Sequence, residues 1–491
     1  MRQSKVYSAC INGTNIQKVI VEVDITRGIP GISIVGMPDT AIYEARSRIR
    51  SAIQACGYTM PRGHIVINLA PSHIRKHGSG FDLAIALGIL LASEQIIIPD
   101  IESYLIVGEL SLSGQVRPVQ GMLAYELFSK EERMTLLSGA KAGEALSVKG
   151  CDRRVLRWLS DIESPLCALS IRLSKAKRTE KNFNEVYGQD FAKRALCIAA
   201  AGRHSALMLG SAGAGKTMLA ERFSSILPKL SEKEALESAR IHSIKGLEFE
   251  SILEGERPFR SPHHSISKAA LIGGGYPIRA GEVSLAHNGV LFMDELSEFS
   301  HDTLQLLRQA LDSGTISLSR SKEQVVLPAK FLLLAASNPC DCGNLYEQDK
   351  ACTCTDNQLK RYAAKLKGPL IDRIDIVFHI KRASSHKLIA ETKSQSSEEL
   401  KSQVFKARSF KKWREEKEDV TCAHTERDRA LLSCKFDRSA QKLLEKLAEQ
   451  SALSARSLIK VLKVSRTIAD LDEESSVKPD HLLEAFNYKV V

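Results

Sequence analysis

Apolar and polar positions alternate along the first third of the chain, and this pattern predicts strands interleaved with helices. In residues 19–25 (VIVEVDI) and 64–69 (HIVINL), apolar side chains occupy every second position, as they do in a strand with one buried face. Asp39 can cap a helix that runs through Ala55. Residues 81–93 are mostly apolar and predict a buried helix. The first third is therefore expected to form an α/β unit of its own.

The rest of the chain changes from strands to helices. Three short apolar runs predict buried strands, at residues 206–209, 289–293 and 330–337. Residues 384–418 are highly charged, with helical periodicity but little apolar face. Further on, residues 442–447 and 458–462 carry apolar side chains at the spacing of one buried helical stripe. The expected fold class is α/β with a helical C-terminal part.

Composition indicates a cytoplasmic protein of several domains with an acidic partner. A chain of 491 residues predicts two to four domains, and its eleven cysteines are typical of reduced cytosolic thiols. No apolar run reaches the roughly eighteen residues that cross a bilayer, so no membrane partner is expected. The net charge of +11 favours nucleic acid as a partner, although the basic clusters at 170–182 and 381–420 would also suit solvated linkers.

Residues 210–217 (GSAGAGKT) fit the phosphate-loop pattern G-x-x-x-x-G-K-[ST], between a predicted strand and a predicted helix. Free backbone N–H groups at the helix start can cradle a polyphosphate. Lys216 would reach the outer phosphates, and the Thr217 hydroxyl would bind Mg²⁺. ATP and Mg²⁺ are the expected cofactors. The nucleotide-binding candidates are Gly210, Ser211, Ala212, Gly213, Ala214, Gly215, Lys216, Thr217 and Met218.

These patterns divide the chain into five predicted segments. They are an N-terminal α/β domain (1–175), a basic linker (176–183), a nucleotide-binding α/β core (184–381), a charged helical connector (382–430) and a C-terminal helical lid (431–491).

Polar side chains follow the second and third predicted strands of the core. Asp294 and Glu295 come directly after the apolar run at 289–293, and Asn338 ends the run at 330–337. Since parallel strands end at the same edge of a sheet, we expect these residues beside the phosphate loop. Asp294 would hold Mg²⁺, Glu295 would polarise the attacking water, and Asn338 would bond the γ-phosphate or that water. The structural alternatives are that the two carboxylates only cap the end of a strand, and that Asn338 is only a turn residue before Pro339.

The order of phosphate loop, Asp-Glu strand, Asn strand, Asp372-Arg373 and a late helix with Arg456 resembles the AAA+ ATPases. Further motifs resemble the magnesium-chelatase-like branch and, within it, the ComM/YifB family. In the core and lid they are PFRSPHHS (258–265), NPC (338–340), GPLIDRID (368–375) and SAR (454–456). In the N-terminal domain they are GMPD (36–39), NLAP (68–71) and GSGFDL (78–83).

The resemblance implies a ring, a hexamer, whose ATP sites are shared between neighbouring subunits. Arg373 would be the finger that reaches the γ-phosphate of the next subunit, and Arg456 would sense the nucleotide from the lid of its own subunit. The loop departs from the family's usual residues at Ser211, Ala212 and Ala214, whose side chains the backbone cradle does not need.

The N-terminal domain resembles the Lon-protease-like fold, which uses a serine nucleophile and a lysine. In this chain Gly80 occupies the position of the serine and Leu123 that of the lysine, so we expect a non-proteolytic module that docks or contacts DNA. Ser79 with Lys76 is the pair that would overturn this interpretation. Basic candidates for DNA contact, or alternatively for a solvated helix face, are Arg46, Arg48, Arg50 and Arg75.

Two further segments carry candidate ligands. Four cysteines in two C-x-C pairs either form a tetrahedral zinc site or remain free thiols; they are Cys340, Cys342, Cys352 and Cys354. Residues 315–327 predict a hairpin with a basic tip, where Arg320 and Lys322 would grip DNA phosphates in the channel of a ring. An ordinary exposed turn is the alternative for this tip. His263 and His264 are expected to form a polar turn rather than ligands.

Three functions are compatible with these features. The first is an ATP-dependent DNA motor that acts on single-stranded or branched DNA and promotes branch migration or strand exchange in homologous recombination and natural transformation. The second is a magnesium-chelatase-type or other protein-remodelling ATPase, which the N-terminal domain argues against. The third is an ATP-dependent Lon-like protease, which the missing Ser-Lys pair argues against. The uneven basic charge favours the first.

Overall fold

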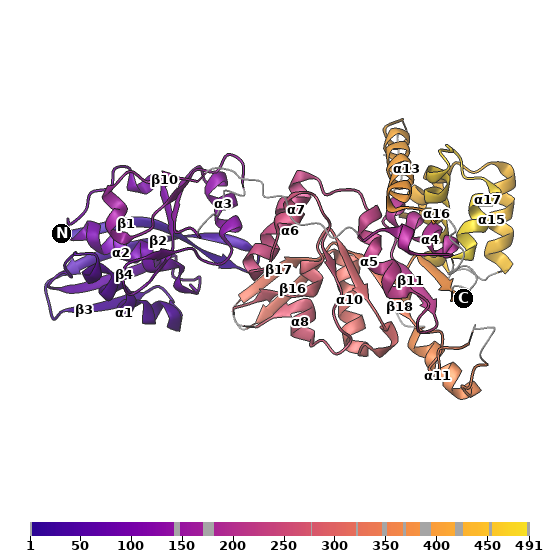
Figure 1. Ribbon diagram of the computed structural model, residues 1–491, viewed down its shortest axis with the longest axis horizontal. Coiled ribbons are helices and arrows are strands. Elements are labelled where there is room, and N and C mark those ends of the chain that lie inside the picture. Colours follow the sequence, from indigo (N-terminus) through magenta and orange to yellow (C-terminus); the bar gives the residue numbers. More distant parts are fainter. Residues whose placement is uncertain are drawn as a thin grey trace.

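The computed structural model describes residues 2–141, 148–169, 181–275, 277–320, 323–345, 351–366, 370–382, 394–417, 426–450 and 454–488. It is elongated, with an N-terminal α/β unit at one end, a second α/β unit in the middle and helices at the other end (Figure 1). Most of the predicted basic linker, Lys322 and two stretches of the predicted connector (383–393 and 418–425) lie outside the described residues.

The N-terminal unit is built on an eight-stranded mixed sheet in the order β10-β9-β8-β5-β1-β2-β4-β3. Its strands are β1 (Arg2–Asn12), β2 (Asn15–Thr26), β3 (Gly31–Val35), β4 (His64–Ala70), β5 (Tyr104–Val107), β8 (Thr135–Ser138), β9 (Arg153–Val155) and β10 (Cys167–Ala168). A small separate pair consists of β6 (Glu109–Leu110) and β7 (Val116–Arg117). The helices are α1 (Thr40–Ala55), α2 (Asp82–Ala92) and α3 (Met122–Glu131).

The local signals in this unit act as the hydropathy pattern predicts. The Asp39 carboxylate accepts a 3.0 Å hydrogen bond from the backbone N–H of Ile42 and starts α1. Helix α2 is buried along nearly its whole length, as its apolar composition requires. Both predicted strands are present as β2 and β4, which pair with each other in antiparallel register.

The middle unit contains a five-stranded sheet in the order β12-β15-β18-β11-β19, and all four strand pairs are parallel. The strands are β11 (Ala206–Gly210), β12 (Phe259–Arg260), β15 (Val290–Met293), β18 (Leu332–Ser337) and β19 (Ile376–Ile380). The three predicted strands are therefore adjacent, with β18 between β11 and β15. Their carboxyl ends share one edge of the sheet.

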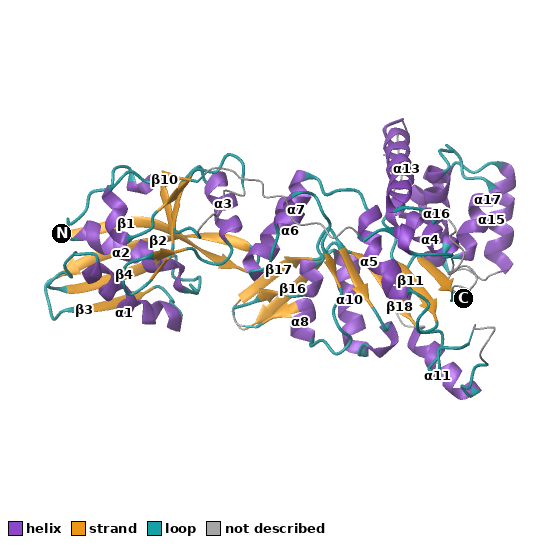
Figure 2. Ribbon diagram, viewed as in Figure 1, coloured by secondary structure: helices purple, strands orange, loops and turns teal. Residues whose placement is uncertain are grey.

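Helices lie around this sheet, and one hairpin lies on the side that faces the N-terminal unit (Figure 2). The helices are α4 (Asp190–Gly202), α5 (Lys216–Ile226), α6 (Glu232–Lys245), α7 (Glu250–Leu253), α8 (Lys268–Ile272), α9 (Glu282–Leu285), α10 (His301–Ser313) and α11 (Asp356–Leu366). The hairpins pair β13 (Gly273–Gly274) with β14 (Arg279–Ala280) and β16 (Thr315–Arg320) with β17 (Glu323–Pro328). The β16–β17 pair confirms the predicted hairpin, with Arg320 opposite Glu323 at its tip.

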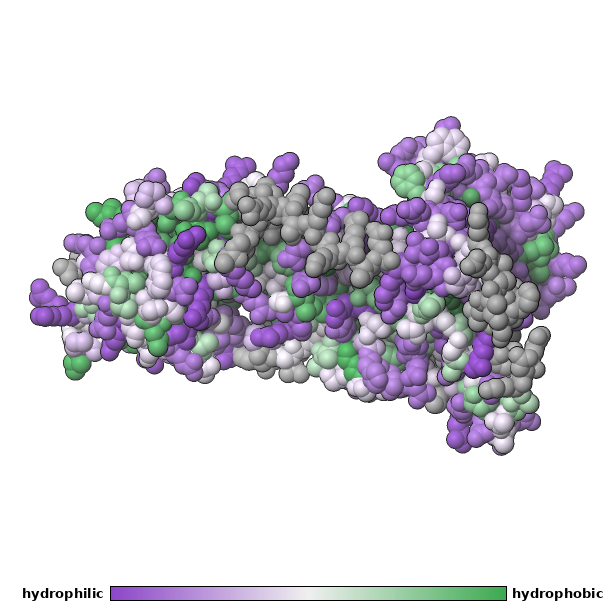
Figure 3. Space-filling model, in the orientation of Figure 1, coloured by the Kyte–Doolittle hydropathy of each residue, from purple (hydrophilic) through white to green (hydrophobic). Residues whose placement is uncertain are grey.

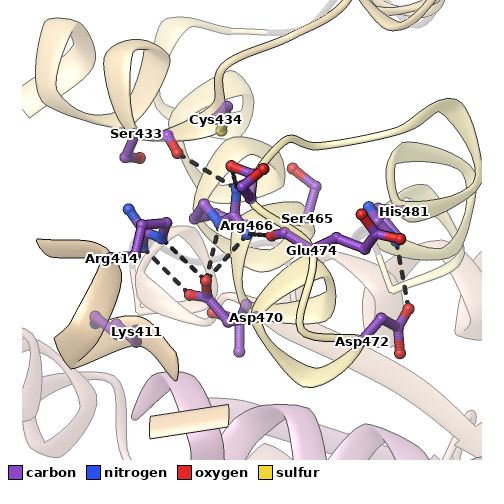
Figure 4. A network of polar contacts seen from close by, with 12 residues as sticks. Lys411, Arg414, Ser433, Cys434, Ser465, Arg466, Asp470, Asp472, Glu474 and His481 are labelled. Atoms are coloured by element: carbon purple, nitrogen blue, oxygen red, sulfur yellow. Dashed lines mark hydrogen bonds and ion pairs between the residues drawn. The ribbon is translucent and has the colours of Figure 1, made fainter. Parts of the chain in front are cut away.

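The C-terminal part is helical, as predicted. It contains α13 (Ser397–Lys417), α14 (Glu426–Cys434), α15 (Arg438–Gln450), α16 (Ala455–Leu471) and α17 (Pro479–Asn487). A buried charge cluster joins three of these helices (Figure 4). Asp470 on α16 accepts hydrogen bonds from Arg414 Nε at 3.1 Å and from Arg466 Nε at 3.2 Å. Arg466 also donates to the Ser433 carbonyl at the end of α14. These bonds hold α13, α14 and α16 together.

The two α/β units are in direct contact. Leu123 and Val148 share a buried apolar cluster with residues of α6 and α7. The Gln120 side chain donates a 3.0 Å hydrogen bond to the Ile244 carbonyl. At the β1–β2 turn, a Cβ on Gly13 would lie 2.2 Å from Val325 Cγ1 of the β16–β17 hairpin. The N-terminal unit thus packs directly on this hairpin.

The surface is mainly hydrophilic on the face drawn in Figure 3, where hydrophobic residues are scattered in small groups. None of the helices in the described part of the chain combines the length and apolar character needed to cross a bilayer.

Candidate nucleotide-binding site

The phosphate loop connects β11 to α5 at the shared edge of the central sheet. Gly213 and Gly215 have φ values of +79° and +90°, which favour glycine, whereas a Cβ on either would meet no atom within 4 Å. The backbone conformation, rather than crowding, therefore requires these two glycines. The first turn of α5, which begins at Lys216, presents N–H groups that no helical carbonyl can satisfy. Such a turn favours an anion.

Lys216 links the loop to the third predicted strand. Its ammonium donates hydrogen bonds to the carbonyls of Gly210 at 2.6 Å and Ser211 at 2.9 Å, and to Asn338 Oδ1 at 3.0 Å. Burial lowers the pKa of Lys216, and the charges of the nearby carboxylates oppose that shift. The amide of Asn338 therefore faces the phosphate-loop lysine and does more than end a strand.

Thr217 and Asp294 form a pair of oxygen ligands next to the loop. The Thr217 hydroxyl donates a 2.8 Å hydrogen bond to Asp294 Oδ2, and Asp294 Oδ1 accepts one from the backbone N–H of Glu295. Neighbouring ligands of an octahedral Mg²⁺ with Mg–O distances near 2.1 Å are about 2.9 Å apart. The donor type and the spacing both fit Mg²⁺.

Glu295 has a partner that the sequence reasoning missed. His264 Nδ1 lies 3.1 Å from Glu295 Oε2, and the His264 ring packs against that of His263 with centroids 4.1 Å apart. These histidines follow β12, and β12 pairs in parallel with β15, so both segments emerge at the same edge. The strand order would have revealed this contact, but the spacing of the motifs along the chain does not.

Arg373 is held within its own subunit by α10. It ends a short 3-10 turn (Ile371–Arg373), and its Nη2 donates a 2.6 Å hydrogen bond to Asp312 Oδ2. A second bond joins Arg373 Nε to Asp312 Oδ1. Arg373 Nη1 is buried and has no hydrogen-bond partner among the described residues. The hydrogen bond from Arg373 is the main reason why the pKa of Asp312 is below its ordinary value.

Arg456, like Arg373, lies near enough to Asp312 for its charge to act on that carboxylate. It is exposed in the first turn of α16, which Ser454 caps, and its charge also lowers the pKa of Asp312. Lys460 of the same helix donates a 2.7 Å hydrogen bond to the Ile374 carbonyl. Within the described part of the chain, no contact joins Arg456 to the phosphate loop. The two candidate arginines thus share the neighbourhood of Asp312.

Other candidates surround the loop more loosely. Met218 is 42% exposed at the start of α5. Arg382, which sequence reasoning did not single out, donates a 2.8 Å hydrogen bond to the Ala212 carbonyl and adds a positive charge there. Lys322 and the side chain of Arg320 are outside the described residues, so their DNA-contact role stays a prediction.

The Ser-Lys pair of the N-terminal unit is engaged elsewhere. The buried Lys76 ammonium donates to the Gly36 carbonyl at 2.9 Å and to the Pro71 carbonyl, whereas the Ser79 hydroxyl bonds Glu109. Of the four basic candidates, Arg48 bonds the buried carboxylate of Asp82, and Arg46 lies over the Tyr43 ring. Arg48 thus has a structural partner.

Comparisons with known proteins bear on all parts of the chain. The family model described as "Magnesium chelatase, subunit ChlI" matches residues 182–388. "Subunit ChlI of Mg-chelatase" matches residues 21–138, and "Magnesium chelatase, subunit ChlI C-terminal" matches residues 394–489. The N-terminal unit is thus matched by a model that carries the chelatase name as well.

Several bacterial proteins are similar to this chain over nearly their whole length, and two of them serve as examples. The chain is 38% identical to "uncharacterized protein YifB" of Escherichia coli K12, over 100% of this chain and 98% of the relative. It is 37% identical to "competence protein ComM" of Haemophilus influenzae, over 99% of this chain and 97% of the relative. A "magnesium-chelatase 67 kDa subunit" of Chlorobaculum parvum is 27% identical over only 32% of this chain and 23% of that subunit.

Proposed function

The chain belongs to the ComM/YifB family of magnesium-chelatase-like AAA+ proteins, and on that premise we propose that it is an ATP-driven DNA motor. The motor would assemble as a hexameric ring and promote branch migration or strand exchange during homologous recombination and natural transformation. The observation that carries the ATPase part is the contact of Lys216 with Asn338 beside the Thr217–Asp294 pair.

Each residue of this edge has a proposed task in hydrolysis. The loop N–H groups and Lys216 bind and orient the phosphates. Thr217 and Asp294 would hold Mg²⁺, which supplies charge neutralisation on the phosphate oxygens. Glu295 would orient the attacking water and accept its proton, and Asn338 would bond the γ-phosphate or that water. The contact with His264 restrains the Glu295 carboxylate.

The shared-site part rests on Arg373. In a single chain this guanidinium is bound to Asp312, and its buried Nη1 has no hydrogen-bond partner among the described residues. The Arg373 side chain would turn away from Asp312 to reach a γ-phosphate held by a neighbouring subunit. Such a contact would couple hydrolysis to ring assembly. Arg456 is proposed to sense nucleotide from the lid, a role that requires the lid to move relative to this structure.

The DNA part has two supports. The chain carries a net charge of +11, and the full-length relative named a competence protein connects the family with competence. The β16–β17 hairpin is the proposed DNA grip.

We also propose a division of the chain into five segments. Residues 1–175 form a non-proteolytic Lon-protease-like module, and 176–183, 184–381, 382–430 and 431–491 are the linker, the AAA+ core, the connector and the lid.

The second candidate is a protein-remodelling ATPase, which the three chelatase family models favour. One experiment separates the two: ATP-dependent strand displacement on forked and four-way DNA, with Lys216→Ala as the inactive control. Strand displacement by the unaltered protein, but not by Lys216→Ala, supports the DNA motor. ATP hydrolysis that DNA does not stimulate, without displacement, would instead support remodelling of a protein partner. A Lon-like protease is the third candidate, and casein degradation that is lost in Ser79→Ala would support it.

A further inference from the structure

The four cysteine sulfurs of Cys340, Cys342, Cys352 and Cys354 lie together in one cluster. The Sγ–Sγ distances are 3.4 Å for Cys340–Cys342, 3.8 Å for Cys340–Cys352 and 3.5 Å for Cys342–Cys352, and all four sulfurs lie within 4.8 Å of one another. A zinc ion with Zn–S bonds of about 2.3 Å spaces its ligands about 3.8 Å apart. A disulfide would need about 2.05 Å. The spacing therefore fits a shared metal and not cross-links.

The chain turns tightly just after Cys340. The Gly343 N–H donates a 3.0 Å hydrogen bond to the Cys340 carbonyl, and Gly343 has a φ of +79°, which favours glycine. Cys340 is buried, and the other three cysteines of the cluster are half-buried. The turn thus places the Cys340 and Cys342 sulfurs side by side.

The cluster is connected to the nucleotide site at short range. Cys340 lies two residues after Asn338, whose side chain bonds Lys216. Beyond the cluster, the Tyr362 hydroxyl on α11 donates a 2.8 Å hydrogen bond to the Asn338 carbonyl and contacts Ser337 Oγ at 3.0 Å. A Cβ on Gly343 would lie 3.9 Å from the Ala212 nitrogen of the phosphate loop. The cysteine cluster and Tyr362 therefore hold Asn338 from two sides.

We propose that the four thiolates bind one structural zinc ion, and that this ion fixes Asn338 against Lys216 so that zinc occupancy controls ATP turnover. Zinc would enter as Zn²⁺ from solution, and the thiols would release their protons without any electron transfer. Asn338 is the residue through which the metal acts, so the cysteines have a positioning role. The coupling half rests on the proposed ATPase function, whereas the zinc half does not.

Metal analysis tests the zinc half. Full-length protein, purified with its affinity tag removed, is expected to carry about one zinc per chain by mass spectrometry. The double variant Cys352→Ser/Cys354→Ser should lose it, whereas Cys167→Ser, an exposed thiol outside the cluster, should retain it. Zinc below about 0.1 per chain in the unaltered protein, or about one iron in its place, overturns the assignment.

Turnover tests the coupling half. Zinc-stripped protein should hydrolyse ATP about 100-fold more slowly, the scale expected when a positioning group moves by about 1 Å, and added Zn²⁺ should restore the rate. This comparison on the unaltered chain remains available where the serine variant fails to fold. Lys216→Ala should lose ATP binding and keep its zinc. An equal rate of ATP hydrolysis with and without zinc refutes the coupling. If the protein shows no ATPase activity in any state, the proposed function and the coupling are both refuted, but the result of the metal analysis is unaffected.

Discussion

The substitution Arg373→Ala tests whether a neighbouring subunit completes the ATP site. In this structure the Arg373 guanidinium contacts Asp312, and no contact within the described residues joins it to the phosphate loop. Nucleotide affinity should therefore stay within about threefold of the unaltered protein, while turnover falls by about 10³-fold or more, the contribution of an arginine finger. The expected signature is a kcat defect without a binding defect.

Loss of the ion pair should not confuse this test. The Arg373 and Asp312 side chains are 16% and 43% exposed, and a pair this exposed contributes roughly 0.2–1 kcal/mol to stability. That is a small share of the roughly 5–15 kcal/mol that holds a domain folded. Because Arg373 keeps the pKa of Asp312 below its ordinary value, the pair is intact at any neutral assay pH. Arg308→Ala is a matched control, since Arg308 contacts the same carboxylate at 3.9 Å.

The assay compares steady-state ATP hydrolysis with binding of a fluorescent ATP analogue. Mixing Arg373→Ala with Lys216→Ala gives the decisive arm, because the first variant keeps an intact loop and the second an intact finger. In randomly mixed rings, about a quarter of all sites would combine the two. Turnover should return to about that fraction of the unaltered rate. Normal turnover by Arg373→Ala alone, or no recovery on mixing, would refute the shared site.

Substitutions at four other positions test the remaining contacts. Lys216→Ala should abolish nucleotide binding in a fluorescence titration, and Glu295→Gln should bind ATP but not turn it over; turnover by the glutamine variant would exclude Glu295 as the base. His264→Ala should lower turnover about tenfold at unchanged nucleotide affinity, because its ring contacts Glu295 and, among the described residues, makes no contact with the phosphate loop. An unchanged rate of hydrolysis would show that His264 plays no part in the reaction. Asp470→Asn should lower the free energy of unfolding, measured in urea, by about 3–5 kcal/mol, because two buried guanidiniums lose their carboxylate partner. Asp472→Asn is the control and should lower it far less, because Asp472 is more exposed. Equal losses in the two variants would contradict a stabilising role for the buried cluster.

The elements that the sequence predicted well are those with local causes. The GSAGAGKT loop, the buried helix at 81–93 and the strands that precede Asp294 and Asn338 are encoded by neighbouring residues, through glycine conformation and hydropathy period. The apolar face of the charged segment at 384–418 was harder to recognise from the sequence. Within it, α13 buries Leu400, Val404 and Ala407 in a narrow stripe that the surrounding lysines and glutamates conceal.

The contacts that escaped prediction join residues far apart in the chain. Arg373 and Asp312 are 61 positions apart, and Arg382 reaches Ala212 across 170. Any of many acids could pair with a given arginine, because charge has no periodicity that identifies its partner. Only the strand order of the folded sheet decides which ends meet.

The strand order of the central sheet explains how one edge could both hydrolyse ATP and control the rate of hydrolysis. Strand β18 lies between β11, which leads into the phosphate loop, and β15, which leads into Asp294 and Glu295. Asn338 directly follows β18, and its side chain bonds Lys216. A chain segment that displaces Asn338 would change phosphate binding and water activation together. The cysteine cluster begins two residues later, and Tyr362 bonds the carbonyl of Asn338 itself. Control exerted at this central strand therefore needs no route through the lid or the hairpin.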